Sequence, residues 1–194
     1  MKIDVNQITE KQKLTIEKGL CDYRYIMKNQ NRNDADFQSV YYDFYLKARW
    51  AVMKKKGNYE PYFEELFCSL PEDELVNTLV RLKDKMESHS YEFSLVTKLF
   101  HTRNPLLPIY DSKVRTYLKS EENVDFWWQI KGAPRKKSEI EKISHDWRAL
   151  IDWYDTFLAS ERGKDWIRWF DSSFPESKDI SDVKKVDFII FATN

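Results

Sequence analysis

The apolar spacing in residues 36–56 is the sequence feature that most constrains the fold. Seven apolar residues recur there at intervals of three and four: Phe37, Val40, Tyr41, Phe44, Tyr45, Ala48 and Val52. This is the period of an α-helix that turns one face toward a core. The segment is therefore predicted to be a long amphipathic helix, and we expect it to be the main core helix.

Helical spacing also recurs along the rest of the chain. Helices are predicted over residues 8–28, 59–70, 71–86, 138–170 and 179–194, with a break near Gly163. A strand is the alternative for 179–194, because β-branched residues lie near its end. The sequence has only four glycines and almost no strand–turn–strand punctuation. The prediction is an all-α fold, either one helical domain over 1–194 or two lobes, 1–90 and 91–194, with a cleft.

Residues 94–118 combine a proline turn with a helix-capping carboxylate. Pro105 and Pro108 cannot continue a helix, so the preceding helix is predicted to end near Arg103. Asp111 is followed by Ser-Lys-Val and then by apolar residues at helical spacing, which is typical of an N-cap. We therefore expect the Asp111 carboxylate to be held rigidly at the start of the next helix.

The helix before this turn is predicted to have a polar face formed by Ser94, Thr97, Lys98 and His101. An amine and an imidazole beside a rigid carboxylate suit acid/base chemistry or stabilisation of a cation. The simpler interpretation of each residue is structural. Capping aspartates after proline turns are common, and Lys98 with His101 is also typical of a solvated helix edge.

This segment resembles the catalytic segment of the helix-hairpin-helix DNA glycosylase superfamily, the base-excision enzymes. The resemblance rests on Asn104-Pro105 at the turn, on the run Pro108-Ile109-Tyr110-Asp111, and on Val114 in the helix that follows. It covers about 25 of the 194 residues. The resemblance implies a fold of two helical lobes and implies that Asp111 is the catalytic carboxylate.

The sequence departs from that superfamily in two places. Two residues separate Pro108 from Asp111 where the usual pattern has one, and residues 84–93 contain no glycine where the family has a glycine-rich hairpin. The family's Schiff-base lysine lies in that hairpin, so its role is not carried over to Lys98. Lys98 is a catalytic candidate on its helical position alone.

Aromatic and basic side chains near Asp111 predict contacts with DNA. Trp127 and Trp128, with Arg135 and Lys136 close by, suit an extruded base and its phosphates. The alternative is that one or both tryptophans belong to the core. The residues expected to bind substrate or DNA are His101, Ser94, Tyr110, Arg103, Lys113, Arg115, Trp127, Trp128, Arg135 and Lys136.

The charge balance limits how nucleic acid could be bound. The chain has 32 basic and 32 acidic side chains, so DNA binding requires a local basic face. Cys21 and Cys68 show no metal-type spacing, and no metal or cofactor is expected. We see no secretory leader and no apolar run long enough to span a membrane, so we expect a soluble, cytoplasmic, monomeric protein with no membrane partner.

The functional hypothesis is a DNA N-glycosylase that flips a modified or damaged base and hydrolyses its glycosidic bond, in an anti-phage setting as an extension. Asp111 would act on the sugar cation or on water, and Lys98 would form an imine, which allows a lyase step, or contact phosphate. The alternative is a non-catalytic helical module that binds nucleic acid or protein. A metal-dependent nuclease is disfavoured, because the acidic residues form no compact ligand cluster.

Overall fold

The computed structural model describes residues 3–46, 60–67, 75–87, 91–124, 126 and 136–193. All regular secondary structure in these residues is helical, so the all-α prediction is confirmed. The elements are η1 (Val5–Gln7), α1 (Glu10–Lys28), α2 (Ala35–Tyr41), η2 (Tyr42–Leu46), α4 (Glu60–Phe67), α5 (Leu75–Lys85), α6 (Phe93–Arg103), α7 (Ser112–Glu121), η4 (Lys137–Glu139), α9 (Ile140–Ala159), α10 (Glu161–Ser173), η5 (Pro175–Ser177) and α11 (Asp182–Thr193).

Several helices begin where a side chain satisfies the free amides of the first turn. Thr9 and Gln12 form a capping box at the start of α1, with the Gln12 side chain accepting from the Thr9 amide at 2.8 Å. Ser160 ends α9 and caps α10 by accepting from the Gly163 amide at 3.0 Å. The predicted break near Gly163 is confirmed and falls at Ser160, because this serine closes one helix and opens the next.

The predicted helix over residues 36–56 differs from the observed structure. The α-helical part, α2, ends at Tyr41, and the chain continues as the π-helical turn η2 from Tyr42 to Leu46. Residues 47–59 lie outside the described residues. A π-helical turn adds a residue to the turn and rotates the side chains that follow it. Periodicity counted at 3.6 residues per turn therefore did not predict where Phe44 and Tyr45 point.

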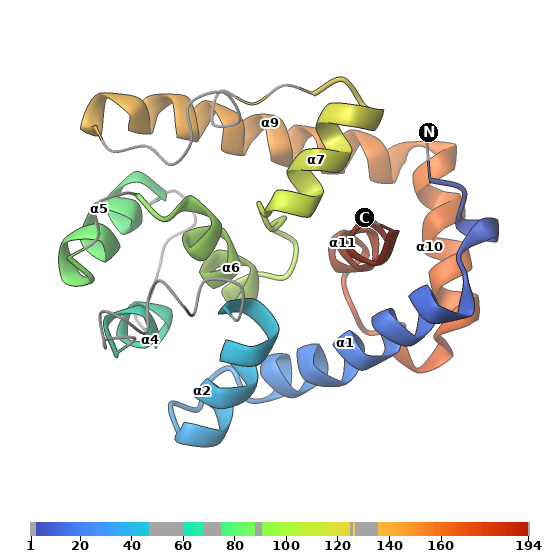
Figure 1. Cartoon of the computed structure of the whole chain (residues 1–194), viewed down its shortest axis with the longest axis horizontal. Helices are drawn as coiled ribbons and strands as arrows, with labels where there is room; N and C mark the ends of the chain where they lie inside the picture. Colours follow the sequence, from blue (N-terminus) through green and yellow to red (C-terminus); the bar gives the residue numbers. More distant parts are fainter. Residues whose placement is uncertain are drawn as a thin grey trace.

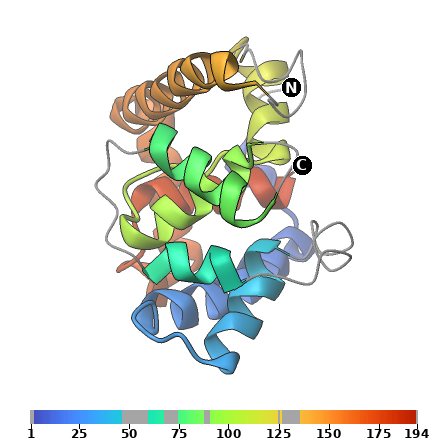
Figure 2. The ribbon, with the colours of Figure 1, turned by 90° about the vertical axis from the view of Figure 1, so that its left-hand side faces the viewer.

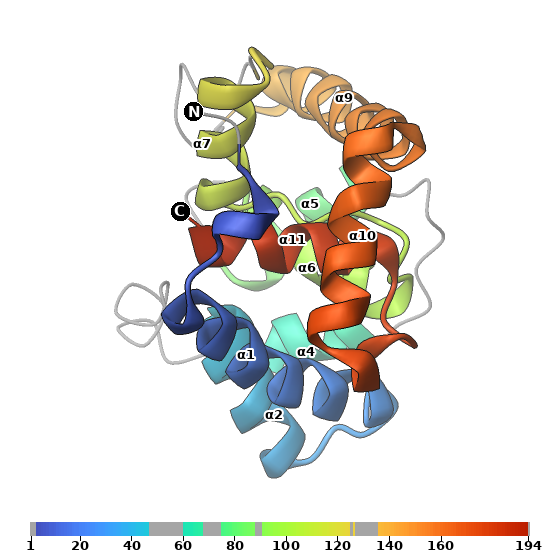
Figure 3. The same cartoon turned by 90° about the vertical axis from the view of Figure 1, so that its right-hand side faces the viewer.

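The terminal helix α11 lies at the centre of the fold. Figure 1 views it end-on, with α1, α7, α9 and α10 around it, and each of these four helices contacts it. Helices α4, α5 and α6 gather on the side shown in Figure 2. Figure 3 shows α1 and α10 on the opposite side. The terminal segment is helical from Asp182 to Thr193, so the helical prediction is confirmed there and the strand alternative is wrong.

Because neighbours surround α11, it buries polar as well as apolar side chains. Val186, Ile189 and Ile190 are completely buried, as a central helix requires. Lys184 and Asp187 on the same helix are also almost completely buried, at 3% and 5% exposure. Buried charges of this kind need partners. The surroundings of Lys184 and Asp187 define the candidate site.

Candidate functional site

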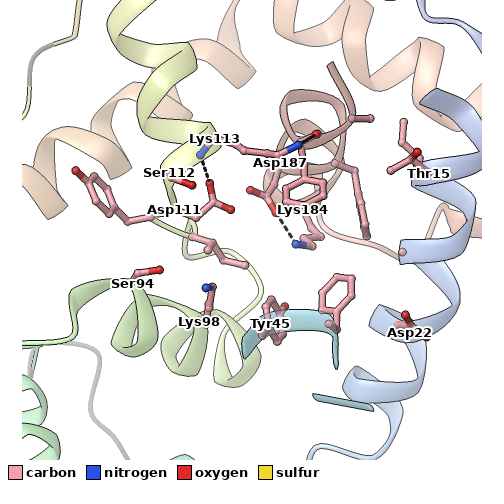
Figure 4. A pocket seen from close by; sticks show the side chains of 18 of the residues that line it. Thr15, Asp22, Tyr45, Ser94, Lys98, Asp111, Ser112, Lys113, Lys184 and Asp187 are labelled. Atoms are coloured by element: carbon pink, nitrogen blue, oxygen red, sulfur yellow. Dashed lines mark hydrogen bonds and ion pairs between the residues drawn. The ribbon is translucent and has the colours of Figure 1, made fainter. Parts of the chain in front are cut away.

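A pocket of about 700 Å³ lies between α1, η2, the start of α7, α6 and α11. Figure 4 shows its polar groups, which come from separate helices: Lys98 from α6, Asp111 from the start of α7, and Lys184 with Asp187 from α11. Apolar lining is provided by Phe44, Phe188 and Phe191, among others. Ligand sites typically combine an apolar lining with a few converging polar groups, so this pocket is the candidate site.

Asp111 is held at the pocket by the helix that it caps. Its Oδ1 accepts hydrogen bonds from the amides of Lys113 at 2.8 Å and Val114 at 2.9 Å, so the N-cap prediction is confirmed. Both bonds end on Oδ1, and Oδ2 takes no part in the capping. The side chain is half-buried and lines the pocket. A rigid carboxylate therefore faces the space in which a ligand would lie.

Lys98 and Ser94 are the two residues of the predicted polar face of α6 that line the pocket. Both are half-buried, one helical turn apart. The next residue of that face, Thr97, is fully buried and accepts a hydrogen bond from the Tyr110 amide at 3.1 Å. This bond ties the proline turn to α6. The structure thus brings Lys98 and Asp111 to the same pocket, as Figure 4 shows.

The ion pair of Lys184 and Asp187 is the part of the site that the sequence analysis missed. Lys184 Nζ donates to Asp187 Oδ2, and the two side chains are only 4% and 7% exposed. Burial raises the pKa of the Asp187 carboxyl, the Lys184 ammonium opposes this, and the Asp111 carboxylate adds to the rise. A signal was present in the sequence, because Lys184, Lys185 and Asp187 interrupt an otherwise apolar terminal segment.

Aromatic rings surround the Lys184 ammonium on several sides. Its Nζ lies 5.3, 5.2, 5.5 and 4.7 Å from the ring centroids of Tyr23, Phe44, Tyr45 and Phe188. These distances allow cation–π attraction, which is stronger where water is excluded. Gly19 of α1 makes room for this arrangement, because a Cβ there would lie 2.8 Å from the Phe188 ring.

Two of the predicted basic contacts, Lys113 and Arg115, also lie at the pocket. Both are half-buried on α7. Lys113 Nζ donates to the Phe191 carbonyl at 2.9 Å and lies 4.1 Å from the centroid of the Phe191 ring. Lys113 therefore joins α7 to the end of α11, where its positive charge also suits the negative end of the helix dipole.

The prediction that His101 binds DNA is wrong, because the side chain is fully buried. Its Nδ1 lies 2.6 Å from the Leu107 carbonyl and its Nε2 lies 3.0 Å from the Tyr23 hydroxyl. A carbonyl only accepts, so Nδ1 carries the proton and Nε2 accepts from Tyr23. Burial, with the nearby Lys184 ammonium, lowers the pKa of His101 to about 3. His101 is a neutral core residue that joins α1 and the proline turn.

Tyr110, which we expected to bind substrate or DNA, packs in the hydrophobic core. The side chain is 2% exposed, and its ring centroid lies 4.8 Å from that of Phe93 and 5.6 Å from that of Phe126. Both ring neighbours are buried. Burial raises the pKa of the Tyr110 hydroxyl above its usual value. Little of the side chain is accessible, although the residue contributes to the pocket wall.

The remaining predicted contacts lie away from the pocket or outside the described residues. Arg103 is half-buried at the end of α6, with its guanidinium 5.7 Å from the centroid of the Phe67 ring. Lys136 is exposed, and its amide donates to Glu139 Oε2 at 3.1 Å. Neither residue lines the pocket. Trp127, Trp128 and Arg135 lie outside the described residues.

A metal-ligand cluster, a membrane-spanning helix or a similar known protein would each indicate a class of site. Among the residues that the structure describes, no three His, Cys, Asp or Glu side chains are grouped as metal ligands would be. None of the helices in the described ranges has the length and apolar character needed to cross a membrane. No protein-family model, curated protein or solved structure matches the chain. The pocket and its polar groups are therefore the features that indicate a function.

Proposed function

We propose that the protein is a DNA N-glycosylase that removes a modified or damaged base, with Asp111 as its catalytic carboxylate. The observation that carries the proposal is the position of Asp111. Its capping bonds hold the carboxylate at the wall of a partly apolar pocket, beside the amine of Lys98. A carboxylate held in advance of the reaction stabilises developing charge better than one that must reorganise.

The chemistry requires a negative group next to the sugar. As the bond between C1′ and the base nitrogen breaks, its electron pair leaves with the base and positive charge builds on the sugar. Asp111 stabilises this charge or accepts the proton of the attacking water. Lys98 contacts phosphate in a purely hydrolytic reaction, or attacks C1′ and forms an imine in a lyase reaction.

The size and lining of the pocket also support a flipped nucleotide as the ligand. A volume of about 700 Å³ lies within the usual range for small-molecule sites. Phe44, Phe188 and Phe191 offer apolar contact to a heterocyclic ring. Lys113 and Arg115 at the start of α7 provide positive charge for the phosphates, which a chain of zero net charge must supply locally.

The test is incubation with DNA duplexes that carry uracil, oxidised, alkylated or glycosylated bases, followed by detection of abasic sites. Asp111→Asn is the decisive variant, because asparagine caps a helix about as well as aspartate but carries no charge. We expect excision to fall by about a hundredfold or more. Unchanged excision in Asp111→Asn would remove the proposed mechanism.

Lys98 is tested separately by borohydride trapping. A covalent protein–DNA product that disappears in Lys98→Ala identifies this amine as the imine-forming group. Excision without any trapped product assigns Lys98 to phosphate contact, and weaker binding of undamaged duplex by Lys98→Ala then checks that role.

A non-catalytic helical module that binds nucleic acid or protein is the second candidate. The absence of glycine in residues 84–93 favours it, because the family's glycine-rich hairpin grips DNA through backbone amides. A failure to form abasic sites on all of these duplexes would favour the binding module over the enzyme.

A further inference from the structure

One carboxylate oxygen of Asp187 has no hydrogen-bond partner in the described part of the chain. Oδ2 accepts from Lys184, whereas Oδ1 is buried and accepts from nothing. The side chain is 7% exposed and lines the pocket. An unsatisfied buried acceptor is destabilising, so a ligand that donates a hydrogen bond to Oδ1 is bound more tightly than one that cannot.

Lys184 places a hydrogen-bond donor directly beside this acceptor. An ammonium group has three N–H donors, and the bond to Asp187 uses one of them. Lys184 also lines the pocket. The ion pair therefore presents a donor and an acceptor side by side, one helical turn apart on α11. Its complement is a ligand edge on which an N–H donor lies next to an acceptor.

A planar heterocycle fits the rest of this end of the pocket. Phe44 and Phe188 contribute apolar surface next to the ion pair, and their ring centroids lie 5.2 and 4.7 Å from Lys184 Nζ. Asp111 is close enough to Asp187 for its charge to act on the Asp187 carboxyl. Figure 4 shows that the carboxylates of Asp111 and Asp187 face the same space. A heterocyclic ring bound at Asp187 would direct the group attached to the ring toward Asp111.

We propose that Lys184 and Asp187 form the base-binding end of the pocket and hold a nucleobase by an N–H donor and an adjacent acceptor on one of its edges. The nucleobase as ligand class rests on the proposed function. Every standard base carries a donor beside an acceptor on its pairing edge. The pair therefore selects for a free edge of this kind, and a base whose donor nitrogen has lost its N–H through methylation is excluded.

The test compares small ligands that differ by one methyl group. Ligand-observed NMR measures their binding to the whole protein. 1-Methyluracil keeps N3–H beside its carbonyl oxygens and carries a methyl where DNA has the sugar. 1,3-Dimethyluracil has lost the donor. 9-Methylhypoxanthine and 1,9-dimethylhypoxanthine form the matched purine pair. We expect the monomethyl compound of at least one pair to bind about tenfold more tightly, because the dimethyl compound leaves Asp187 Oδ1 without a donor.

Two variants assign this preference to the ion pair. In Lys184→Met/Asp187→Leu both charges are removed together, so no buried charge is left alone, and the preference should disappear while cooperative unfolding is retained. Lys185→Met is the matched control. Lys185 is the neighbouring buried lysine, but it pairs with Asp171 and Asp182, each at 2.9 Å, and does not line the pocket. This control should keep the preference.

The outcomes separate the base-binding site from the proposed function. Equal binding of both members of each pair, or no binding of any of the four compounds up to about 10 mM, overturns the proposal, since a ligand this small is expected to bind in the millimolar range. A preference that survives in the double variant also overturns it. A preference lost in the double variant but without excision from DNA supports the base-binding site and rejects the glycosylase. Excision of bases by a protein that binds both members of each pair equally supports the glycosylase and rejects the base-binding site.

Discussion

Lys184 donates a hydrogen bond to Asp187 one turn further along α11, and neighbouring helices surround both side chains. The pair thus combines a structural and a functional role. Each charge makes the burial of the other tolerable, and together they form one wall of the pocket that Asp111 lines from α7. Their coupling leads to a stability prediction that is independent of any activity.

Removal of Lys184 alone should destabilise the protein strongly. Lys184→Met leaves Asp187 as an unpaired buried charge, and we expect a loss of about 3–5 kcal/mol in the free energy of unfolding. Lys184→Met/Asp187→Leu should lose clearly less, because neither charge remains. Urea denaturation measures both. A double variant that is less stable than the single one would contradict this account of the pair.

Substitutions of Asp111 should separate capping from chemistry. Asp111→Ala removes the bonds to the amides of Lys113 and Val114, so the free energy of unfolding should fall by about 1 kcal/mol. Asp111→Asn keeps the cap, so the free energy of unfolding should fall by about a few tenths of a kcal/mol at most. Chemical denaturation gives these values, and base excision should fall by about a hundredfold or more in both variants. Equal stability of Asp111→Ala and the wild type would show that the cap contributes nothing.

The lowered pKa of His101 predicts that the stability of the protein depends on pH. Its pKa is about 3 in the folded protein against a usual value of 6.5, so the unfolded chain takes up a proton at a higher pH than the folded protein does. The contribution of neutral His101 to the free energy of unfolding is complete above pH 6.5. It falls by about 1.4 kcal/mol per pH unit below pH 6.5 and stops falling near pH 3.

Denaturation curves between pH 7 and pH 5 measure this slope. His101→Gln, which does not titrate, should show a smaller slope than the wild type over that interval, at a lower overall stability. If both proteins lost stability in parallel, protonation of His101 would not be the cause.

Gly163 should not tolerate a side chain. A Cβ at this position would lie 2.0 Å from the Phe157 carbonyl oxygen and 2.8 Å from its carbon, both of which are backbone atoms. We expect Gly163→Ala to lower the free energy of unfolding by about 2 kcal/mol or more, against the usual helix preference for alanine. Lys164→Ala, at the next and exposed position, should change it by less than about 0.5 kcal/mol. Thermal unfolding compares them, and a neutral Gly163→Ala would mean that the α9–α10 corner relaxes easily.

The sequence by itself determined the helical class, several helix ends and the position of Asp111. Periodicity and capping depend on residues within one or two turns of each other, so Asp111 could be assigned as an N-cap without knowledge of the fold. The proline turn, the break near Gly163 and the terminal helix were predictable for the same reason.

Only the tertiary structure decided which polar residues face the pocket. The helical wheel grouped Lys98 with His101, but α1 packs over His101 and bonds to it through Tyr23, whereas Lys98 lines the pocket. Lys184 and Asp187 became site residues because four helices surround α11. Burial depends on segments that are distant in the sequence, so a local pattern identifies a polar face and leaves open whether a ligand or another helix covers it.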